Sequence, residues 1–495
     1  MSFEAELKAA RSGRVDSERL GELARTALAQ QREEDVLPLL ARTARNDARL
    51  WQWKGLLERA LDEHAEALKS FAEAGRFAPN DGGIAHGHAR VALEAGVASI
   101  PLFSRALQLA PDNAQVYLGL TAARIAAGEG EQAEADLDQI LARSSLWIEG
   151  HKQLAQVRSL LGRREHAYDS LDRALAAQPQ QSALWQALFD LEVQAEDYER
   201  LSESAEAARS AGVPAQVTRT YAFIAASELG RTSSADELLK VGGAGVPPVW
   251  LVRHALRNGR MEEAVRLIDS QLSGPKAADI WPYAETAWRM TGDPRLEWLA
   301  GDSSLISIID LGEELAAIPG LNDLLRSLHA VSGRYLNQSV RGGSQTDGPL
   351  LSRIEPEIRA LRAIIVRAVE GHVARFGSLP DSHPQKMAGA RRIRFSGSWS
   401  VRLVDGGFHS VHVHPRGWIS SALYLGLPEK LSDEEGWLTL SEPPPELRLD
   451  LAPARTVPPK IGQLVLFPSW MWHGTRPFPT GERLSVAFDV APPVS

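Results

Sequence analysis

Cysteine is absent from all 495 residues of this sequence. A chain without thiols forms no disulfide, binds no zinc through thiolates, holds no iron–sulfur cluster and has no cysteine nucleophile. Any metal in this protein must therefore be bound through nitrogen and oxygen atoms. The 13 histidines are the nitrogen donors available for such a site.

Long apolar runs and basic blocks are also missing. No stretch approaches the roughly 18 consecutive apolar residues that suggest a membrane-spanning helix. The N-terminal stretch "MSFEAELKAARSGRVDSERL" lacks the apolar core of a signal peptide. The net charge is −9 and no basic block offsets it, which argues against a nucleic-acid partner. We therefore expect a cytoplasmic protein without membrane or nucleic-acid partners.

The composition changes along the chain. About the first 300 residues are rich in Ala, Leu, Glu, Arg and Gln and contain few strand-forming residues. About the last 175 residues contain more Pro, Gly, Trp and β-branched residues, and apolar residues alternate in "WSVRLVDGG", "QLVLFPSW" and "RLSVAFDV". Alternation with a period of two is typical of strands. The pattern predicts an α+β protein, with helices first and a sheet afterwards.

The helical half contains an internal repeat. Three similar helix-ending stretches, "FAPND", "LAPDN" and "AQPQQ", contain Pro79, Pro111 and Pro179. Pro111 and Pro179 are 68 residues apart, which is twice the 34-residue period of tetratricopeptide repeats. The unit 48–81 also has the repeat's characteristic residues in register, namely Trp51, Gly55, Ala67 and Phe71. The chain resembles tetratricopeptide repeats over about residues 46–210, and less regular helix pairs are expected to continue to about residue 300.

Each of these positions has a physical role in such repeats. Small residues let two antiparallel helices approach closely, large residues fill the groove between neighbouring pairs, and proline ends the second helix. Stacked pairs form a concave surface, which we expect to bind a peptide or protein. The alternative is that the helices form only a spacer or a dimerisation arm.

Three histidines fall within "HSVHVHP", residues 409–415. In an extended chain His412 and His414 project from the same face, because side chains alternate with a period of two. His409 is three residues before His412 and faces the other way, unless a bulge reverses it. A third ligand is expected from another segment, and His473 in "LVLFPSWMWHGTRPF" is the candidate. Ten residues beyond it, Arg483 and a serine two positions later share one face of a final strand.

These motifs together resemble the Fe(II)- and 2-oxoglutarate-dependent oxygenases. That family shares a double-stranded β-helix, a jelly roll related to the cupins. Its pattern is His-x-Asp on one strand, a distal His, and Arg-x-Ser about ten residues beyond. The resemblance is strongest to a prolyl-hydroxylase-like branch that is often fused to tetratricopeptide repeats. It rests on "GGFHSVHVHPRGWISSALYL", "IGQLVLFPSWMWHGTRPF" and "GERLSVAFDV", with an upstream signature at 338–349, and covers about residues 320–495.

The resemblance implies a site for Fe(II), 2-oxoglutarate and O₂. Its metal ligands would be His412, His414 and His473, with no catalytic side chain beyond the metal centre. Three ligands on one face leave three positions open for the 2-oxo acid and O₂. Arg483 would pair with the distal carboxylate of 2-oxoglutarate, because a guanidinium suits a planar carboxylate. The other residues expected at the co-substrate are Ser485 and Tyr424.

The sequence departs from the family pattern at one position. His414 stands where the usual acidic ligand is found, so the site loses a negative charge. Imidazole suits iron, and three histidines can still bind Fe(II). Two other arrangements stay open: His412 and His473 bind iron alone with water in the third place, or His409 is a ligand and His414 either supports the metal ligands from behind or contacts the substrate.

Several residues around these motifs are candidates for substrate contacts. The stretch "QSVRGGSQT" has polar residues and paired glycines, which predicts a loop, and loops often contain functional residues. The candidates are Gln338, Arg341, Gln345, Trp418 and His409.

These features predict four parts along the chain. Helices 1–45 precede tetratricopeptide-like repeats at 46–300, a linker at 301–320 and an oxygenase-like double-stranded β-helix at 321–495. The expected function is an Fe(II)- and 2-oxoglutarate-dependent dioxygenase that hydroxylates a peptide or protein recruited by the helical repeats. The alternatives are an inactive metal-binding jelly roll on a repeat scaffold, or a three-histidine dioxygenase that does not use 2-oxoglutarate.

Overall fold

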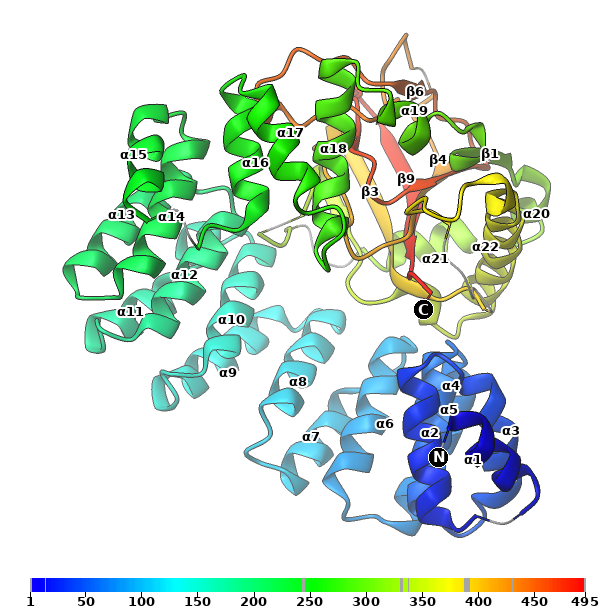
Figure 1. The fold of residues 1–495 in the computed structure, drawn as a ribbon. Coiled ribbons are helices and arrows are strands. Elements are labelled where there is room, and N and C mark those ends of the chain that lie inside the picture. The colour runs from blue at the N-terminus through cyan, green and yellow to red at the C-terminus, as the bar shows by residue number, and fades with distance from the viewer. Residues whose placement is uncertain are drawn as a thin grey trace.

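The computed structural model describes residues 2–13, 15–242, 245–329, 333–336, 338–386, 392–429 and 431–493. A long helical arm, residues 3–300, curves around a domain built on two antiparallel sheets (Figure 1). The α+β prediction is therefore confirmed. None of the helices in these described ranges combines the length and apolar character needed to cross a membrane.

The arm is a series of antiparallel helix pairs. Its helices are α1 (Phe3–Arg11), α2 (Ser17–Ala29), α3 (Glu33–Thr43), α4 (Ala48–Ala60), α5 (His64–Phe77), α6 (Gly82–Glu94), α7 (Ile100–Leu109), α8 (Ala114–Ala126), α9 (Gly130–Arg143), α10 (Ile148–Leu160), α11 (Asp169–Ala177), α12 (Ser182–Gln194), α13 (Tyr198–Ser210), α14 (Ala215–Glu228), α15 (Thr232–Gly242), α16 (Pro248–Arg257), α17 (Met261–Asp269), α18 (Ala277–Thr291) and α19 (Arg295–Ala300). From α4 to α16, the first helices of successive pairs begin 32 to 34 residues apart. The repeat thus extends well beyond residue 210, where its sequence pattern fades.

Close packing between pairs explains the small residues of the repeat. The ring of Phe71, on α5, is completely buried between α4 and α6. A Cβ atom on Gly55 would lie 2.7 Å from this ring, and one on Gly87 would lie 2.3 Å from it. Glycine at both positions therefore makes room for the aromatic ring that joins the first two regular repeats.

The sheet domain contains a large and a small antiparallel sheet. Its strands are β1 (Ser307–Asp310), β2 (Val340–Gln345), β3 (Phe395–His409), β4 (Ile419–Gly426), β5 (Leu438–Leu440), β6 (Arg455–Val457), β7 (Gln463–Pro468), β8 (His473–Thr475) and β9 (Glu482–Val490). The six-stranded sheet has the order β1-β7-β4-β9-β3-β2, and the three-stranded sheet has the order β6-β5-β8. This pair of antiparallel sheets is the architecture of a jelly roll.

Two segments differ from the sequence-based expectation. The expected linker 301–320 contains β1, which pairs with β7 at the edge of the large sheet. The stretch "QSVRGGSQT", expected as a loop, contains β2, which pairs with β3. The register of β2 shifts between Arg341 and Gly343, and Gly342 between them has φ +69°. This bulge removes the alternation by which a strand is usually recognised.

Helices cover both sides of the sheet domain. Helix α22 (Pro356–Ala374), with α21 (Leu321–Ser327), packs on one face of the large sheet in a buried cluster that includes residues of β4, β7 and β9. On the other side, α16–α18 share a buried cluster with β5, β6 and β7. The indole N–H of Trp472 reaches the carbonyl oxygen of Pro282 at 3.2 Å, and its ring meets Tyr283 edge-on at 5.3 Å. The last repeats are thus part of the core of the sheet domain.

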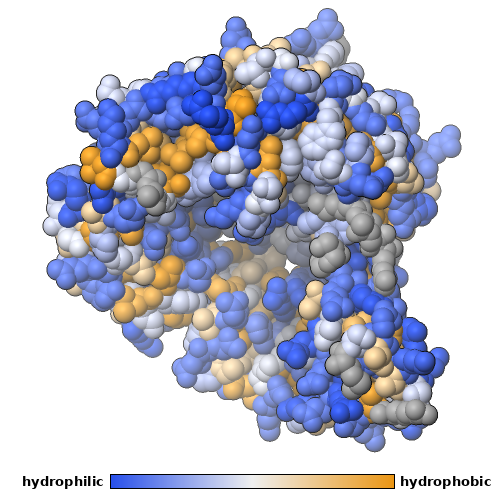
Figure 2. Space-filling view, in the orientation of Figure 1, coloured by the Kyte–Doolittle hydropathy of each residue, from blue (hydrophilic) through white to orange (hydrophobic). Residues whose placement is uncertain are grey.

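The beginning of the arm also contacts the sheet domain. Arg394 pairs with the buried Glu33 of α3. Arg392 lies 2.6 Å from Glu63, beside the start of α5. Because the arm is attached at both ends, arm and domain together enclose an opening. The background is visible through this opening in Figure 2. The structure is therefore a closed loop of repeats rather than an open solenoid.

Candidate metal centre

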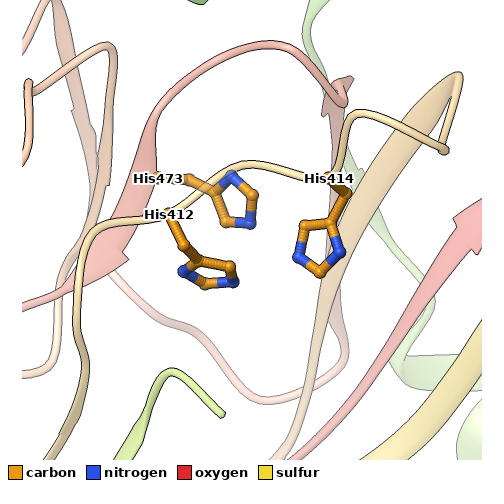
Figure 3. Close-up of side chains that lie close together, drawn as sticks. All are labelled: His412, His414 and His473. Carbon is orange, nitrogen blue, oxygen red and sulfur yellow. The ribbon is translucent and has the colours of Figure 1, made fainter. Parts of the chain in front are cut away.

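Three histidine side chains meet between the two sheets (Figure 3). His412 and His414 follow the end of β3, and His473 is the first residue of β8. The backbones of His412 and His473 exchange two hydrogen bonds of 2.9 and 3.0 Å, which fixes the two segments side by side. Each histidine contributes one ring nitrogen to a group of three, and these three nitrogens all lie within 4.8 Å of one another. The structure thus brings together the three residues that the sequence singled out.

Hydrogen bonds to backbone carbonyls orient two of the rings. Nδ1 of His412 lies 2.8 Å from the carbonyl oxygen of Ser410, and Nδ1 of His473 lies 2.9 Å from that of Met471. A carbonyl oxygen only accepts, so each Nδ1 carries the hydrogen and donates it. Each Nε2 therefore carries the lone pair of its ring rather than the hydrogen. Metal-binding histidines are commonly oriented in this way.

A carboxylate orients the third ring. Nδ1 of His414 lies 2.8 Å from Oδ2 of Asp489, on β9. Oδ1 of the same carboxylate accepts a hydrogen bond of 2.7 Å from the hydroxyl of Ser420, and Asp489 is only 6% exposed. The indole of Trp399 stacks on the ring of His414 with centroids 5.6 Å apart. The negative charge missing from the usual ligand position therefore stands directly behind the histidine that replaces it.

Burial keeps the imidazoles of His412 and His473 neutral. Loss of hydration, together with the neighbouring imidazoles, lowers the pKa of His473 to about 3 and that of His412 well below its ordinary value. The neutral imidazole is the form that binds a metal ion. The Nε2 atoms of His412 and His473 are thus available as ligands at neutral pH without the loss of a proton.

A buried guanidinium lies in the same cavity. Arg483, on β9, is 2% exposed, and its Nη1 donates to the carbonyl oxygen of Gly436 at 2.9 Å. Its Nε has no hydrogen-bond partner, and no carboxylate forms an ion pair with it, within the described residues. Burial accordingly lowers the pKa of Arg483. A buried cation without an anion is unfavourable, so this position is suited to a ligand that supplies a carboxylate.

The other residues expected at the co-substrate lie beside Arg483. The guanidinium of Arg483 is 4.8 Å from the centre of the Tyr424 ring. The hydroxyl of Tyr424 is buried and has no hydrogen-bond partner in the described part of the chain. Ser485 lies directly opposite Tyr424 in the pairing of β9 with β4 and lines the cavity. Two buried polar groups, the Tyr424 hydroxyl and Nε of Arg483, thus lack partners at neighbouring positions.

The cavity that contains these residues has a volume of about 770 Å³. It includes four residues expected to contact substrate, which are Gln338, Arg341, Gln345 and His409. It also reaches the arm, where Gln194, at the end of α12, and Glu196 form part of its wall. The metal centre therefore lies in a cavity shared by the sheet domain and the helical arm.

Two residues differ in their placement from the remaining candidates. Trp418 is 4% exposed and lies in the core beneath α22, where its indole N–H donates to the carbonyl oxygen of Gln385 at 3.0 Å. It was expected to contact substrate, but it packs on the helix-covered side of the sheet and is not among the described residues that line the cavity. His409 lines the cavity, but its Nδ1 lies 3.2 Å from the hydroxyl of Ser339 and it stands outside the group of three.

Sequence analysis did not single out Asp489, Trp399 or Ser339. A signal existed for Asp489, because it is six residues after Arg483 on the same strand and therefore shares its face. Trp399 lies in an alternating strand, where an aromatic residue more often belongs to the core. Ser339 approaches His412 only through the pairing of β2 with β3, which local sequence does not reveal.

Family models match one segment in each half of the chain. Residues 397–489 match the family described as "Putative 2OG-Fe(II) oxygenase", and residues 97–157 match a tetratricopeptide repeat family. These matches confirm the two resemblances inferred from the sequence. No curated protein matches the chain.

Solved structures that are similar to the chain are tetratricopeptide repeat proteins. YrrB, described as a TPR protein with an unusual peptide-binding site, is 18% identical over 38% of this chain and 98% of that protein, with a TM-score of 0.29. MamA from Desulfovibrio magneticus RS-1 is 17% identical over 36% of this chain and 99% of that protein, also with a TM-score of 0.29. A thermophilic repeat protein from Thermus thermophilus is 21% identical over 34% of this chain and 95% of that protein, with a TM-score of 0.26.

Proposed function

We propose that the protein is an Fe(II)- and 2-oxoglutarate-dependent dioxygenase that hydroxylates a side chain of a peptide or protein. One observation supports this most strongly: three converging imidazoles share a cavity with a buried guanidinium that has no carboxylate partner among the described residues. The family match of residues 397–489 supports the same chemistry.

The donor set fits Fe(II). His412, His414 and His473 would hold the ion through Nε2, because their Nδ1 atoms are already engaged by oxygen acceptors. Imidazole suits iron, and three ligands leave room for a bidentate co-substrate and O₂. Bound iron would supply the oxidation of a substrate C–H bond, coupled to conversion of 2-oxoglutarate and O₂ into succinate and CO₂. The protein orients all three rings, keeps those of His412 and His473 neutral, and places the carboxylate of Asp489 behind His414.

Arg483 would bind the distal carboxylate of 2-oxoglutarate. The incoming anion would pair with the guanidinium, and the hydroxyls of Ser485 and Tyr424, which are paired residues on neighbouring strands beside Arg483, would donate to it. Both hydroxyl-bearing residues are buried, so these contacts form with little competition from water. The chain thereby fixes one end of the co-substrate and directs the other end toward the three imidazoles.

A polypeptide substrate is favoured by the position of the cavity. Its wall includes Gln194 and Glu196 of the arm as well as Arg341 and Gln345 of β2. A polypeptide bound along the arm can therefore present one side chain to the metal centre. Tetratricopeptide repeats generally form surfaces of this kind.

Each of the two alternative functions leaves one feature of the site without a role. A three-histidine dioxygenase that does not use 2-oxoglutarate has no need for a buried guanidinium without an anion. An inactive jelly roll has no need for three rings that are oriented through Nδ1 at one point. Both features have a direct role in the proposed reaction.

The experiment that tests the proposal is a comparison of Arg483→Ala with the matched variant Arg476→Ala. Arg476 is 40% exposed and pairs with Glu442. With Fe(II) present, 2-oxoglutarate should bind at least about tenfold more weakly to Arg483→Ala, since a charge-assisted hydrogen bond contributes about 1.5–3 kcal/mol. Arg476→Ala should bind it as the wild type does. Equal affinity in all three proteins would exclude this co-substrate site.

Succinate formation provides a second measurement. Wild-type protein with Fe(II), O₂ and 2-oxoglutarate should release succinate slowly even without its substrate. His473→Ala should bind Fe(II) more weakly and release no succinate. Failure of the wild type to bind Fe(II) would contradict the proposed enzyme.

A further inference from the structure

One segment of the sheet domain lies on the helical arm. Residues 333–336, between α21 and β2, contact the C-terminal half of α10. The hydroxyl of Ser159 donates to the carbonyl oxygen of Arg334 at 2.8 Å, and the backbone N–H of Leu336 donates to Oε1 of Gln156 at 2.9 Å. Gln156 and Ser159 are three residues apart and therefore share a helix face. The arm thus binds peptide groups of a segment that is neither helix nor strand.

Side chains of the segment fill apolar positions on the arm. Leu336 is 4% exposed and belongs to the buried cluster formed by α10–α15. Tyr335 packs against a second cluster that includes Leu154 and Leu160. At Gly333, a Cβ atom would lie 1.7 Å from the carbonyl oxygen of Leu160, so only glycine permits this approach. The arm thus offers a close backbone approach to Gly333 and an apolar contact to each of Tyr335 and Leu336.

We propose that this face of α10 and its neighbours is a peptide-binding groove, and that residues 333–336 are an internal ligand that competes with peptides from outside. The partner is a peptide with glycine at one position and an aromatic residue and leucine at the second and third positions after it. The proposal does not depend on the metal or on 2-oxoglutarate, because binding of the peptide can be measured without either.

A row of polar side chains continues on the arm beyond the internal ligand. Lys152 on α10 lies 3.3 Å from Asp190 on α12, whose carboxylate also accepts a hydrogen bond of 2.7 Å from Tyr221 on α14. Gln156 lies 3.4 Å from Gln194 on α12. Polar side chains on three successive first helices thus extend the surface that holds Leu336. A longer peptide would find further hydrogen-bonding groups in the same row.

Displacement of the internal ligand would reach the candidate metal centre. Ser339 is three residues after Leu336, and its carbonyl oxygen accepts from the backbone N–H of Ser410 at 2.9 Å. Its hydroxyl lies 3.3 Å from Nε2 of His412. The segment therefore joins the groove to one of the three histidines over a few residues. A peptide that takes the place of Leu336 would change the surroundings of that ring.

The test uses a fluorescently labelled synthetic peptide with the sequence of residues 333–340, GRYLNQSV, added to full-length protein. In the wild type the tethered segment acts at an effective concentration of about millimolar, so the free peptide should bind poorly. Leu336→Asp should release the internal segment, and the peptide should then bind at least about tenfold more tightly than to the wild type. Gly333→Ala, which clashes with Leu160 instead, should have the same effect.

Matched controls separate the groove from non-specific binding. A peptide with aspartate in place of its leucine should not bind the Leu336→Asp protein. Adding Gln156→Ala and Ser159→Ala to Leu336→Asp should abolish binding of the original peptide. Equal, weak binding to the wild type and to both released variants would overturn the proposal. Loss of the arm's helical circular dichroism in both variants would also overturn it, because a displaceable ligand is not needed for folding.

Discussion

The carboxylate of Asp489 lies 2.8 Å from Nδ1 of His414. In the proposed site it places, behind this histidine ligand, the negative charge that an aspartate ligand would carry. Such outer carboxylates raise the basicity of a histidine ligand and fix its orientation. Asp489→Asn should therefore lower the affinity for Fe(II) or Co(II) by about 10–100-fold. Anaerobic metal titration measures this, with Asp450→Asn, an exposed carboxylate, as the control. Unchanged affinity in Asp489→Asn would show that the ion pair has no role in metal binding.

Restoring the usual aspartate ligand alone should not improve the site. In His414→Asp the new carboxylate would face the buried Asp489, and two like charges at short distance oppose each other. The double variant His414→Asp/Asp489→Asn removes that repulsion. We expect metal affinity to be lowest in the single variant His414→Asp and higher in the double variant. Metal titration of both variants measures these affinities. Tighter metal binding by His414→Asp than by the double variant would contradict the prediction.

Buried histidines should make the metal-free protein sensitive to acid. Burial lowers the pKa of His372, which is 1% exposed, to about 4, against about 6.5 in an unfolded chain. Between pH 6.5 and 4 the unfolded chain therefore binds a proton that the folded chain does not, and stability falls as pH falls. The loss from this residue reaches at most about 3 kcal/mol. Above pH 6.5 it contributes no pH dependence.

The measurement is the melting temperature at pH 7.5 and at pH 4.5. His372→Gln should show a smaller decrease between the two pH values than the wild type. The exposed His166 provides the control, and His166→Gln should behave as the wild type does. An identical decrease in His372→Gln and wild type would contradict the assignment.

The two ion pairs at the start of the arm should differ in strength. Glu33 is 1% exposed, so Arg394→Ala would leave a buried carboxylate without its partner and should cost about 3–5 kcal/mol. Glu63 is 45% exposed, and Arg392→Ala should cost at most about 1 kcal/mol. Hydrogen exchange of α3 and α5 would report the local effect. Similar protection in the two variants would show that the pair at Glu33 does not hold the arm.

Local sequence was sufficient for features that repeat or alternate. The 34-residue period predicted the helix pairs, and spacing by two predicted that His412 and His414 project together. The same rules failed for β2, where Gly342 introduces a bulge, and for β1, which is only four residues long. Trp418 was misplaced because alternation gives two faces but does not say which one a helix covers.

Contacts between distant segments were beyond such rules. The hydrogen bonds of residues 334 and 336 to α10 join positions 175 and 180 residues apart in the chain. Neither partner has an unusual sequence that marks the contact. The contact between Ser339 and His412 could not be predicted either, because it depends on the pairing of strands that are distant in the sequence.

Attachment of the arm at both ends also limits how the repeat array can change. An open solenoid tolerates gain or loss of a whole repeat, because only nearest neighbours are in contact and the free end simply moves. Here removal of one unit, such as residues 114–147, would leave a gap between Glu33 and Arg394 or between Tyr283 and Trp472. Gain or loss of a whole repeat would therefore disrupt one of the two attachments between the arm and the sheet domain.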